Sequence, residues 1–116
     1  MKLSVPNAIL FVLDPTNETV EIPDYQALVS RTGNCVSVGT QADVDGETKV
    51  FLSRDVPDGL TCVFDGIVGT PGGHLGIKTS EDVLLHCMEG LELNTPITVW
   101  VDDERWPSCV SVVVAA

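Results

Sequence analysis

Short apolar segments separated by turn residues run along the whole chain. Most of them alternate apolar and polar positions with a period of two, as strands with one buried face do, and none keeps a helical period of about 3.6 residues. We predict strands over these segments: Ala8–Leu13, Thr19–Ile22, Cys35–Gly39, Thr48–Ser53, Leu60–Asp65, His74–Thr79, Asp82–Met88, Pro96–Asp102 and Cys109–Ala115. Eight to ten short strands at a spacing of roughly ten residues favour an all-β fold, an antiparallel β-sandwich or barrel.

The pattern also predicts which positions are buried. Leu75 and Ile77 should face the core, because polar residues alternate with them. Ala8–Leu13 is apolar almost without interruption, which is typical of a strand buried on both faces. Cys109–Ala115 carries no charge, so we expect it to be paired inside a sheet or covered by a partner.

Turn residues separate the predicted strands. Asp45-Gly46 predicts a hairpin turn, and Pro57-Asp58-Gly59 predicts a second turn. Two segments allow two interpretations: Tyr25–Ser30 fits a strand or a single helical turn, and Ser80–Met88 fits a strand or a short helix that Ser80 would cap. No linker, repeat or low-complexity tract interrupts residues 1–116, so we expect a single domain.

The charge of the chain is strongly unbalanced. It has 17 Asp and Glu against 6 Lys and Arg, a formal net charge of −11, and residues 79–104 contain no Lys or Arg. Such a surface repels nucleic acid and anionic membranes and attracts basic partners. Acidic composition also keeps proteins soluble, and both explanations remain open. Because 44% of the residues are hydrophobic, the chain should fold.

The cysteines and the N-terminus indicate the compartment. Cys35, Cys62, Cys87 and Cys109 lie in apolar runs without a C-x-x-C pair. We expect four free, buried thiols in a reducing cytoplasm, with two disulfides as the alternative. Pro6-Asn7 interrupts the first apolar run, which favours a strand over a secretory signal. No run approaches the about 18 residues of a membrane span, so we expect a soluble cytoplasmic protein.

Patterns for catalysis and metal binding are weak. His86 and Cys87 are neighbours on a predicted strand, so their side chains should point to opposite faces and form no dyad. Residues 43–47 begin like a Ca²⁺ loop, but strand character resumes too early for a loop of about 12 residues. The glycines of residues 66–73 lack the Lys and the helix of a phosphate-binding loop. We therefore expect no catalytic residue, no metal, no cofactor and no enzymatic activity.

Two acidic turns form the candidate binding surface. An exposed Trp framed by acidic residues is a plausible anchor for a protein partner, although this Trp could also fold back over the edge of the sandwich. The candidate residues are Asp102, Asp103, Glu104 and Trp106 in one turn and Asp43, Asp45 and Glu47 in the other.

Four stretches of the chain, together roughly half of it, carry a family resemblance. They are Gly33–Thr40, Thr48–Leu52, Gly73–Ile77, and Gly90 with the following Ile97–Trp100. In their order they resemble the competence protein J family, small intracellular β-proteins that include a nuclease inhibitor. The resemblance implies a β-sandwich that acts by binding another protein. It carries over no functional residue, because the matching positions are strand residues and glycines.

Three functions follow from these observations. The leading hypothesis is a small acidic intracellular inhibitor or immunity-type protein that blocks a basic protein partner, with a nuclease as one candidate. The second is a structural or assembly subunit that forms homodimers through its β-sheets. The third is a small ligand-binding β-barrel, which would need a deep apolar cavity with His74 or His86 at its floor. Nucleic acid and membranes are not expected as partners.

Overall fold

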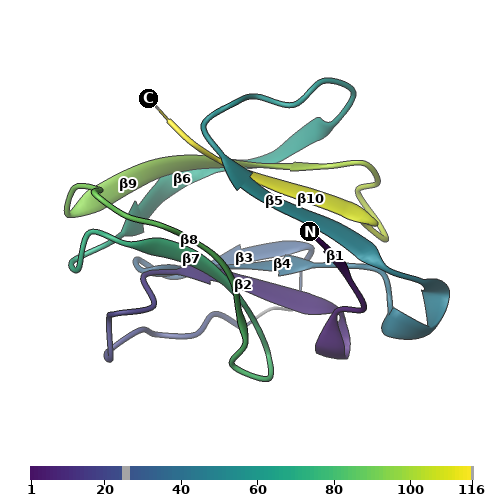
Figure 1. The fold of residues 1–116 in the computed structure, drawn as a ribbon, viewed down its shortest axis with the longest axis horizontal. Coiled ribbons are helices and arrows are strands. Elements are labelled where there is room, and N and C mark those ends of the chain that lie inside the picture. The colour runs from purple at the N-terminus through teal and green to yellow at the C-terminus, as the bar shows by residue number, and fades with distance from the viewer. Residues whose placement is uncertain (25–26, 116) are drawn as a thin grey trace.

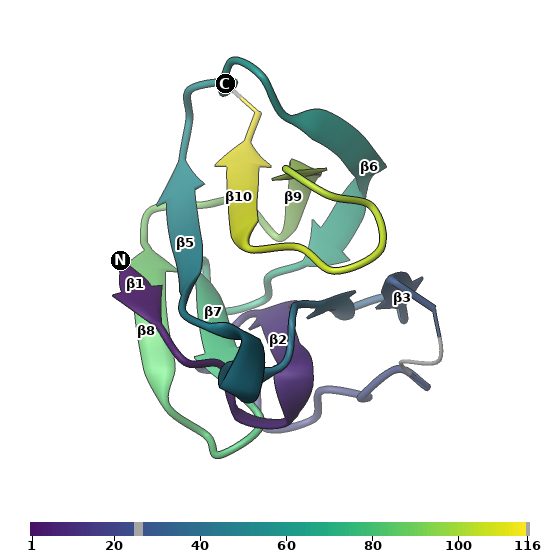
Figure 2. The same cartoon turned by 90° about the vertical axis from the view of Figure 1, so that its right-hand side faces the viewer.

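Two five-stranded sheets pack face to face in the computed structural model, which describes residues 1–24 and 27–115. Figure 1 shows the two layers, and Figure 2 shows them from one end. The first sheet has the order β1-β5-β10-β9-β6, with β1 Lys2–Leu3, β5 Thr48–Ser53, β10 Cys109–Val114, β9 Asn94–Val101 and β6 Thr61–Gly69. The second has the order β3-β4-β2-β7-β8, with β3 Val29–Arg31, β4 Cys35–Gly39, β2 Ile9–Leu13, β7 Leu75–Thr79 and β8 Leu84–Met88. Two short 3₁₀ helices, η1 Pro6–Ala8 and η2 Asp43–Asp45, lie in connections. The predicted all-β fold is confirmed.

The main core lies between the sheets and consists largely of Val. Leu75 and Ile77 are fully buried in it, as predicted from the alternation. From β9 the same core receives Ile97, Val99 and Val101. β-branched side chains suit this position because they pack well on a pleated surface.

The strand β2 is buried on both faces, as its continuous apolar run predicted. Leu10 and Val12 belong to the main core, whereas Ile9, Phe11 and Leu13 form a second cluster with Cys35 on the other face of the sheet. Val20 packs against this second cluster. The segment that follows β2 therefore covers the outside of the second sheet.

The strand predicted over Thr19–Ile22 is therefore wrong. The segment is irregular, and its amides bond to side chains instead of a neighbouring strand: Thr19 N donates to Asn17 Oδ1 at 3.1 Å and Glu21 N donates to Asn34 Oδ1 at 3.1 Å. Its apolar residues alternate because they cover a sheet, not because they belong to one.

The predicted hairpin at Asp45-Gly46 is also wrong. β4 and β5 lie in different sheets, and the connection between them contains η2. Gly46 has φ +124, which a residue with a side chain rarely adopts. Asp45-Gly46 does lie at a turn, as its residues predict, but the chain crosses there from one sheet to the other.

The structure describes one of the two ambiguous segments in full and the other in part, and it extends one predicted strand. Ser80–Met88 contains the strand β8 and no helix, because a turn closed by the bond from Asp82 N to Thr79 O precedes it. Of Tyr25–Ser30, residues 25 and 26 lie outside the described part, and β3 begins at Val29. The strand predicted over Leu60–Asp65 is longer than expected, because β6 continues to Gly69.

The uncharged C-terminal strand is paired inside a sheet, as expected. β10 lies between β9, to which it is antiparallel, and β5, to which it is parallel. The edge strand β6 is protected on its free side. Arg31 Nη2 donates to Ile67 O at 2.9 Å and lies 5.4 Å from the centre of the Phe64 ring, and a bulge interrupts the register between Cys62 and Phe64. Such features discourage edge-to-edge pairing with another chain.

The four cysteines are free, but only one is buried. Cys35 is buried, Cys109 is partly exposed, and Cys62 and Cys87 are exposed. The expectation of four buried thiols is therefore wrong for three of them. Cys62 lies at the bulge of the edge strand β6, and Cys87 lies on the edge strand β8, where a second covering layer is missing.

No helix among the described residues is long and apolar enough to cross a membrane.

Candidate protein-binding surface

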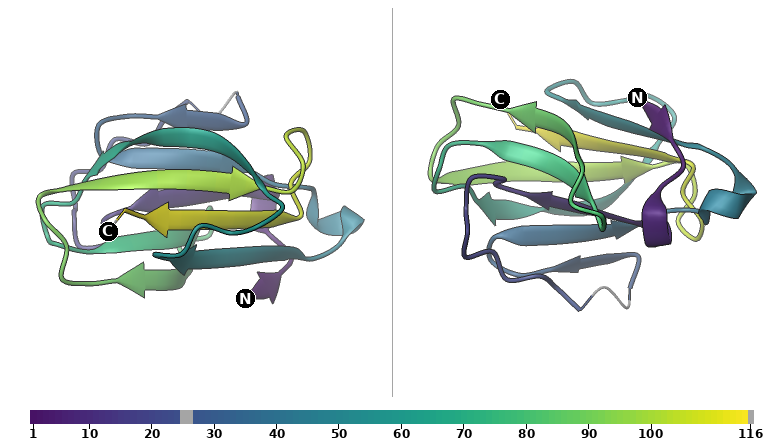
Figure 3. Two further views of the ribbon diagram at one scale, coloured as in Figure 1. Left: turned by 90° about the horizontal axis from the view of Figure 1, so that it is seen from above. Right: turned by 60° about the horizontal axis from the view of Figure 1, so that its bottom comes forward.

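The structure brings the two predicted acidic turns together at one end of the sandwich. The β4–β5 connection and the β9–β10 turn lie beside each other in Figures 2 and 3. Backbone hydrogen bonds join them: Gln41 N donates to Pro107 O at 2.8 Å, and Lys49 N donates to Ser108 O at 2.9 Å. We call residues 43–47 and 102–106 the acidic end. All seven predicted binding residues belong to it, and all are exposed.

The sequence could not show this juxtaposition, because the turns are more than fifty positions apart. It results from the parallel pairing of β5 with β10, which starts both strands at the same end of the first sheet, with Lys49 opposite Cys109. The turns that precede the two strands must therefore meet.

Asp102 stabilises its own turn. Its Oδ1 accepts hydrogen bonds from Ser108 N at 2.9 Å and Cys109 N at 3.0 Å, and its Oδ2 accepts one from Ser108 Oγ. Partial burial alone would raise the pKa of this carboxyl group, but the hydrogen bonds from Ser108 and Cys109 outweigh it and lower the pKa. Asp102 is thus charged at neutral pH and is also a structural residue.

Asp103 stabilises the tip of the same turn by accepting hydrogen bonds from backbone amides. Its Oδ1 accepts hydrogen bonds from Trp106 N at 3.0 Å and Arg105 N at 2.7 Å, and these bonds lower the pKa of its carboxyl group. By contrast, no hydrogen bond or ion pair to the described residues occupies the Glu104 carboxylate. Glu104 is therefore the acid of this turn that is free to contact a partner.

Trp106 projects into solvent at the acidic end. It is 64% exposed, whereas the following Pro107 is buried. The alternative that Trp106 folds back over the sandwich is therefore wrong. The two amide bonds to Asp103 hold the backbone that carries the indole, which lowers the entropy lost when the side chain is bound.

The second acidic turn is closed by its own backbone. Asp45 N donates to Ala42 O at 3.0 Å, Gly46 N donates to Asp43 O at 3.2 Å, and Gln41 Nε2 donates to Glu47 O at 3.0 Å. The carboxylates of this turn are not needed for these bonds. They extend the negative surface of the first turn without a structural task.

The histidines have structural surroundings. His86 Nε2 lies 3.0 Å from Val50 O and so links β8 of the second sheet to β5 of the first. His74 Nε2 lies 3.8 Å from Glu89 Oε1. In the described part of the chain no group of three or more His, Cys, Asp or Glu side chains could hold a metal ion.

Asp14 is a buried polar residue that the sequence analysis did not single out. It is fully buried; its Oδ1 accepts bonds from Thr16 N at 2.8 Å and Thr16 Oγ1 at 2.6 Å, and its Oδ2 accepts one from Gly72 N at 2.6 Å. The Asp-Pro-Thr sequence is a turn signal that could have identified it. It joins the end of β2 to the turn before β7.

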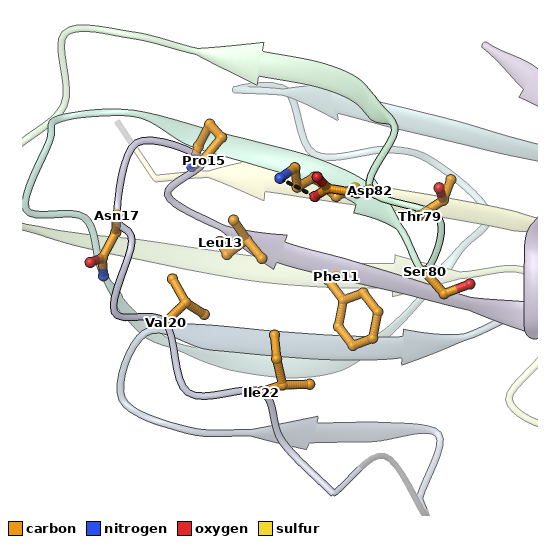
Figure 4. Close-up of a pocket in the computed structure, with 10 residues that line it drawn as sticks. Phe11, Leu13, Pro15, Asn17, Val20, Ile22, Thr79, Ser80 and Asp82 are labelled. Atoms are coloured by element: carbon orange, nitrogen blue, oxygen red, sulfur yellow. Dashed lines mark hydrogen bonds and ion pairs between the residues drawn. The ribbon is translucent and has the colours of Figure 1, made fainter.

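A hollow of about 310 Å³ lies on the outside of the second sheet (Figure 4). Phe11 and Leu13 from β2 face Val20 and Ile22 from the covering segment, and the ion pair of Lys78 Nζ with Asp82 Oδ1 at 2.5 Å lies at one side. No histidine lines it. Apolar residues of β2 and of the covering segment line part of it, and the remaining lining residues are largely polar: Asn17, Lys78, Thr79, Ser80 and Asp82.

The fold of this chain is similar to that of a protein of known structure. No protein-family model matches the sequence, and no curated protein matches it either. Among solved structures, the chain is similar to ComJ from Bacillus subtilis, an inhibitor of the DNA-degrading activity of NucA. The TM-score is 0.72 at 11% sequence identity, and the match covers 100% of this chain and 93% of ComJ. The resemblance to the competence protein J family is thus supported, and over its whole length the chain has the fold of ComJ.

Proposed function

We propose that this chain is a non-enzymatic inhibitor that binds a basic protein, with a nuclease of the NucA kind as its partner. The observation that carries the proposal is the acidic end, where two turns that are distant in sequence place seven exposed residues at the same end of the sandwich. The similarity to ComJ supports the same class of function. A cytoplasmic location, expected from the sequence, would fit an inhibitor that protects its own cell.

The mechanism is electrostatic attraction followed by steric block. Acidic side chains steer a basic surface and raise the association rate above the roughly 10⁵–10⁶ M⁻¹s⁻¹ of unsteered encounters. A nuclease cleft is basic because it binds phosphates, so an acidic end competes for the same surface. Trp106 then supplies apolar contact, since exposed Trp residues are frequent binding hot spots.

The free carboxylates should carry the steering. Asp102 and Asp103 hold the turn, so replacing them changes both charge and shape. Asp43, Glu47 and Glu104 have no such role, so their replacement by Gln or Asn isolates the charge effect.

The test measures DNA degradation by purified NucA in the presence of increasing amounts of the chain. We expect inhibition that weakens as salt is raised, and that is weaker and less dependent on salt in the Asp43→Asn/Glu47→Gln/Glu104→Gln triple variant. The control replaces three exposed acids outside the acidic end, Glu18, Glu21 and Glu92, by Gln and makes the net charge less negative by the same amount. An absence of inhibition at low salt would refute the nuclease partner, and equal losses in both triple variants would refute the role of the acidic end.

A further inference from the structure

A second surface feature lies beside the acidic end and is not part of it. A hollow of about 500 Å³ opens on the first sheet between β5, β10 and the β5–β6 loop; we call it the β5–β10 hollow. Its volume falls in the range of about 300–1,000 Å³ that is typical of ligand sites. We infer that it takes one large apolar side chain from an extended segment of the protein partner, with a Lys or Arg on each side of that residue. This inference rests on the proposed function.

Most of the surface that lines the hollow is apolar, although Ser53 and His86 also contribute to it. Phe51 of β5 is 42% exposed and Val56 of the loop is 63% exposed, and Pro57 and Leu60 line the same space. Phe51 is paired in register with Ser111 of β10, which is buried and also lines the hollow. Burial of such apolar surface by a partner is favourable in proportion to the area removed from water.

Negative charge flanks the hollow at both ends. At the loop end, Asp55 and Asp58 line it, and no hydrogen bond or ion pair to the described residues occupies their carboxylates. At the other end the lining residue Cys109 donates its N–H to Asp102, so the hollow continues directly into the acidic end. An apolar centre between two acidic ends is complementary to an apolar residue between two basic ones.

The dimensions give the spacing of the bound residues. The hollow follows β5 from Lys49 to Ser53, and four steps of about 3.3 Å along a strand make about 13 Å. An extended peptide of five residues covers that length in four steps, so the expected pattern is basic, any residue, apolar, any residue, basic. Alternate side chains of an extended segment point to the same side, which suits this pattern.

Lys49 is the cation in the wall of the hollow, and it opposes a basic ligand. Removing its charge should therefore strengthen binding, which is an effect that a purely apolar site would not show. A second copy of this chain suits the site poorly, because each copy has a net charge of −11. An anionic membrane is repelled for the same reason.

The experiment is an NMR titration of the ¹⁵N-labelled full chain with Ac-Lys-Ala-Leu-Ala-Lys-NH2. We expect saturable shifts at the amides of Phe51, Val56 and Ser111, and about tenfold weaker binding by Val56→Ser, the typical loss for a truncated anchor contact. Lys49→Gln should bind more tightly. The matched control is Val83→Ser, because Val83 is 54% exposed and lies outside both the hollow and the acidic end. It should bind as the unaltered chain does.

Four outcomes would overturn the inference. The first is that Ac-Glu-Ala-Leu-Ala-Glu-NH2 causes the same shifts as the basic peptide, and the second is that the basic peptide causes no shift. The third is that the shifts are confined to residues 43–47 and 102–106. The fourth is that amides at the hollow shift with protein concentration in the absence of peptide, which would indicate a second copy. The NucA assay separates the two proposals. If Val56→Ser inhibits as the unaltered chain does while the acidic triple variant does not, the hollow is refuted and the proposed function stands. Loss of the proposed function instead appears as no NucA inhibition by any form.

Discussion

Asp102→Ala should destabilise the fold far more than Glu104→Ala, although both remove one acid from the same turn. Asp102 accepts three hydrogen bonds from Ser108 and Cys109, whereas Glu104 accepts none from the described residues. A hydrogen bond contributes about 0.5–1.5 kcal/mol net, so three would give at most about 4.5 kcal/mol. Asp102 is exposed, so water replaces part of each bond; we expect a loss of about 1–2 kcal/mol.

Urea denaturation at pH 7 measures this loss as a lower midpoint at unchanged slope. Glu104→Ala should stay within about 0.5 kcal/mol of the unaltered chain, as most surface substitutions do. A loss for Asp102→Ala no greater than that for Glu104→Ala would refute the structural role of Asp102.

The pH dependence provides a second check. Because the hydrogen bonds lower the pKa of Asp102 in the folded state, its contribution is present above the unfolded pKa of about 3.9 and is lost as the pH falls through the folded value. The difference between Asp102→Ala and the unaltered chain should therefore shrink as the pH falls below about 4. A difference that stays constant over that range would show that the charge of Asp102 is not involved.

Three further predictions concern the rest of the molecule. Gly72→Ala should destabilise the fold by about 2 kcal/mol or more, because an added Cβ would lie 1.9 Å from Thr16 Oγ1; thermal unfolding followed by circular dichroism measures this, and an unchanged Tm would contradict it. Cys62 and Cys87 should react with a thiol reagent in the native protein, whereas Cys35 should react only after unfolding, because burial raises the pKa of its thiol to about 12; mass spectrometry of the labelled sites checks the order, and early labelling of Cys35 would contradict it. Light scattering should show a monomer at all concentrations, since β10 is paired on both sides; a dimer would favour the assembly hypothesis.

Several elements could be predicted because their information is local. The period-two alternation around Leu75 and Ile77 identified both their strand and their buried face, and the continuous apolar run before Asp14 identified a strand buried on both sides. Where the prediction was wrong, tertiary packing changed the meaning of the same pattern. Thr19–Ile22 alternates like a strand, but it covers the outside of a sheet that already has its neighbours, so its amides bond to side chains.

The candidate site could also be predicted only in part. The sequence identified its residues one by one, since acids in turns are recognisable without a structure. It did not identify their roles: Asp102 and Asp103 hold the backbone of the turn, while Glu104 remains free. A hydrogen bond between a carboxylate and an amide six residues away depends on how the turn closes, which composition does not determine.

The sequence by itself determined the all-β class, the Val-rich core positions and the net charge of −11. These follow from residue type and spacing, because burial of alternate side chains and the count of ionisable groups need no partner strand. Only the tertiary structure decided that β5 and β10 are parallel neighbours. That pairing brings two turns from distant parts of the chain to one end and places Phe51 beside Ser111. Both the acidic end and the β5–β10 hollow exist because β5 and β10, which are remote in sequence, are neighbours that start at the same end of one sheet.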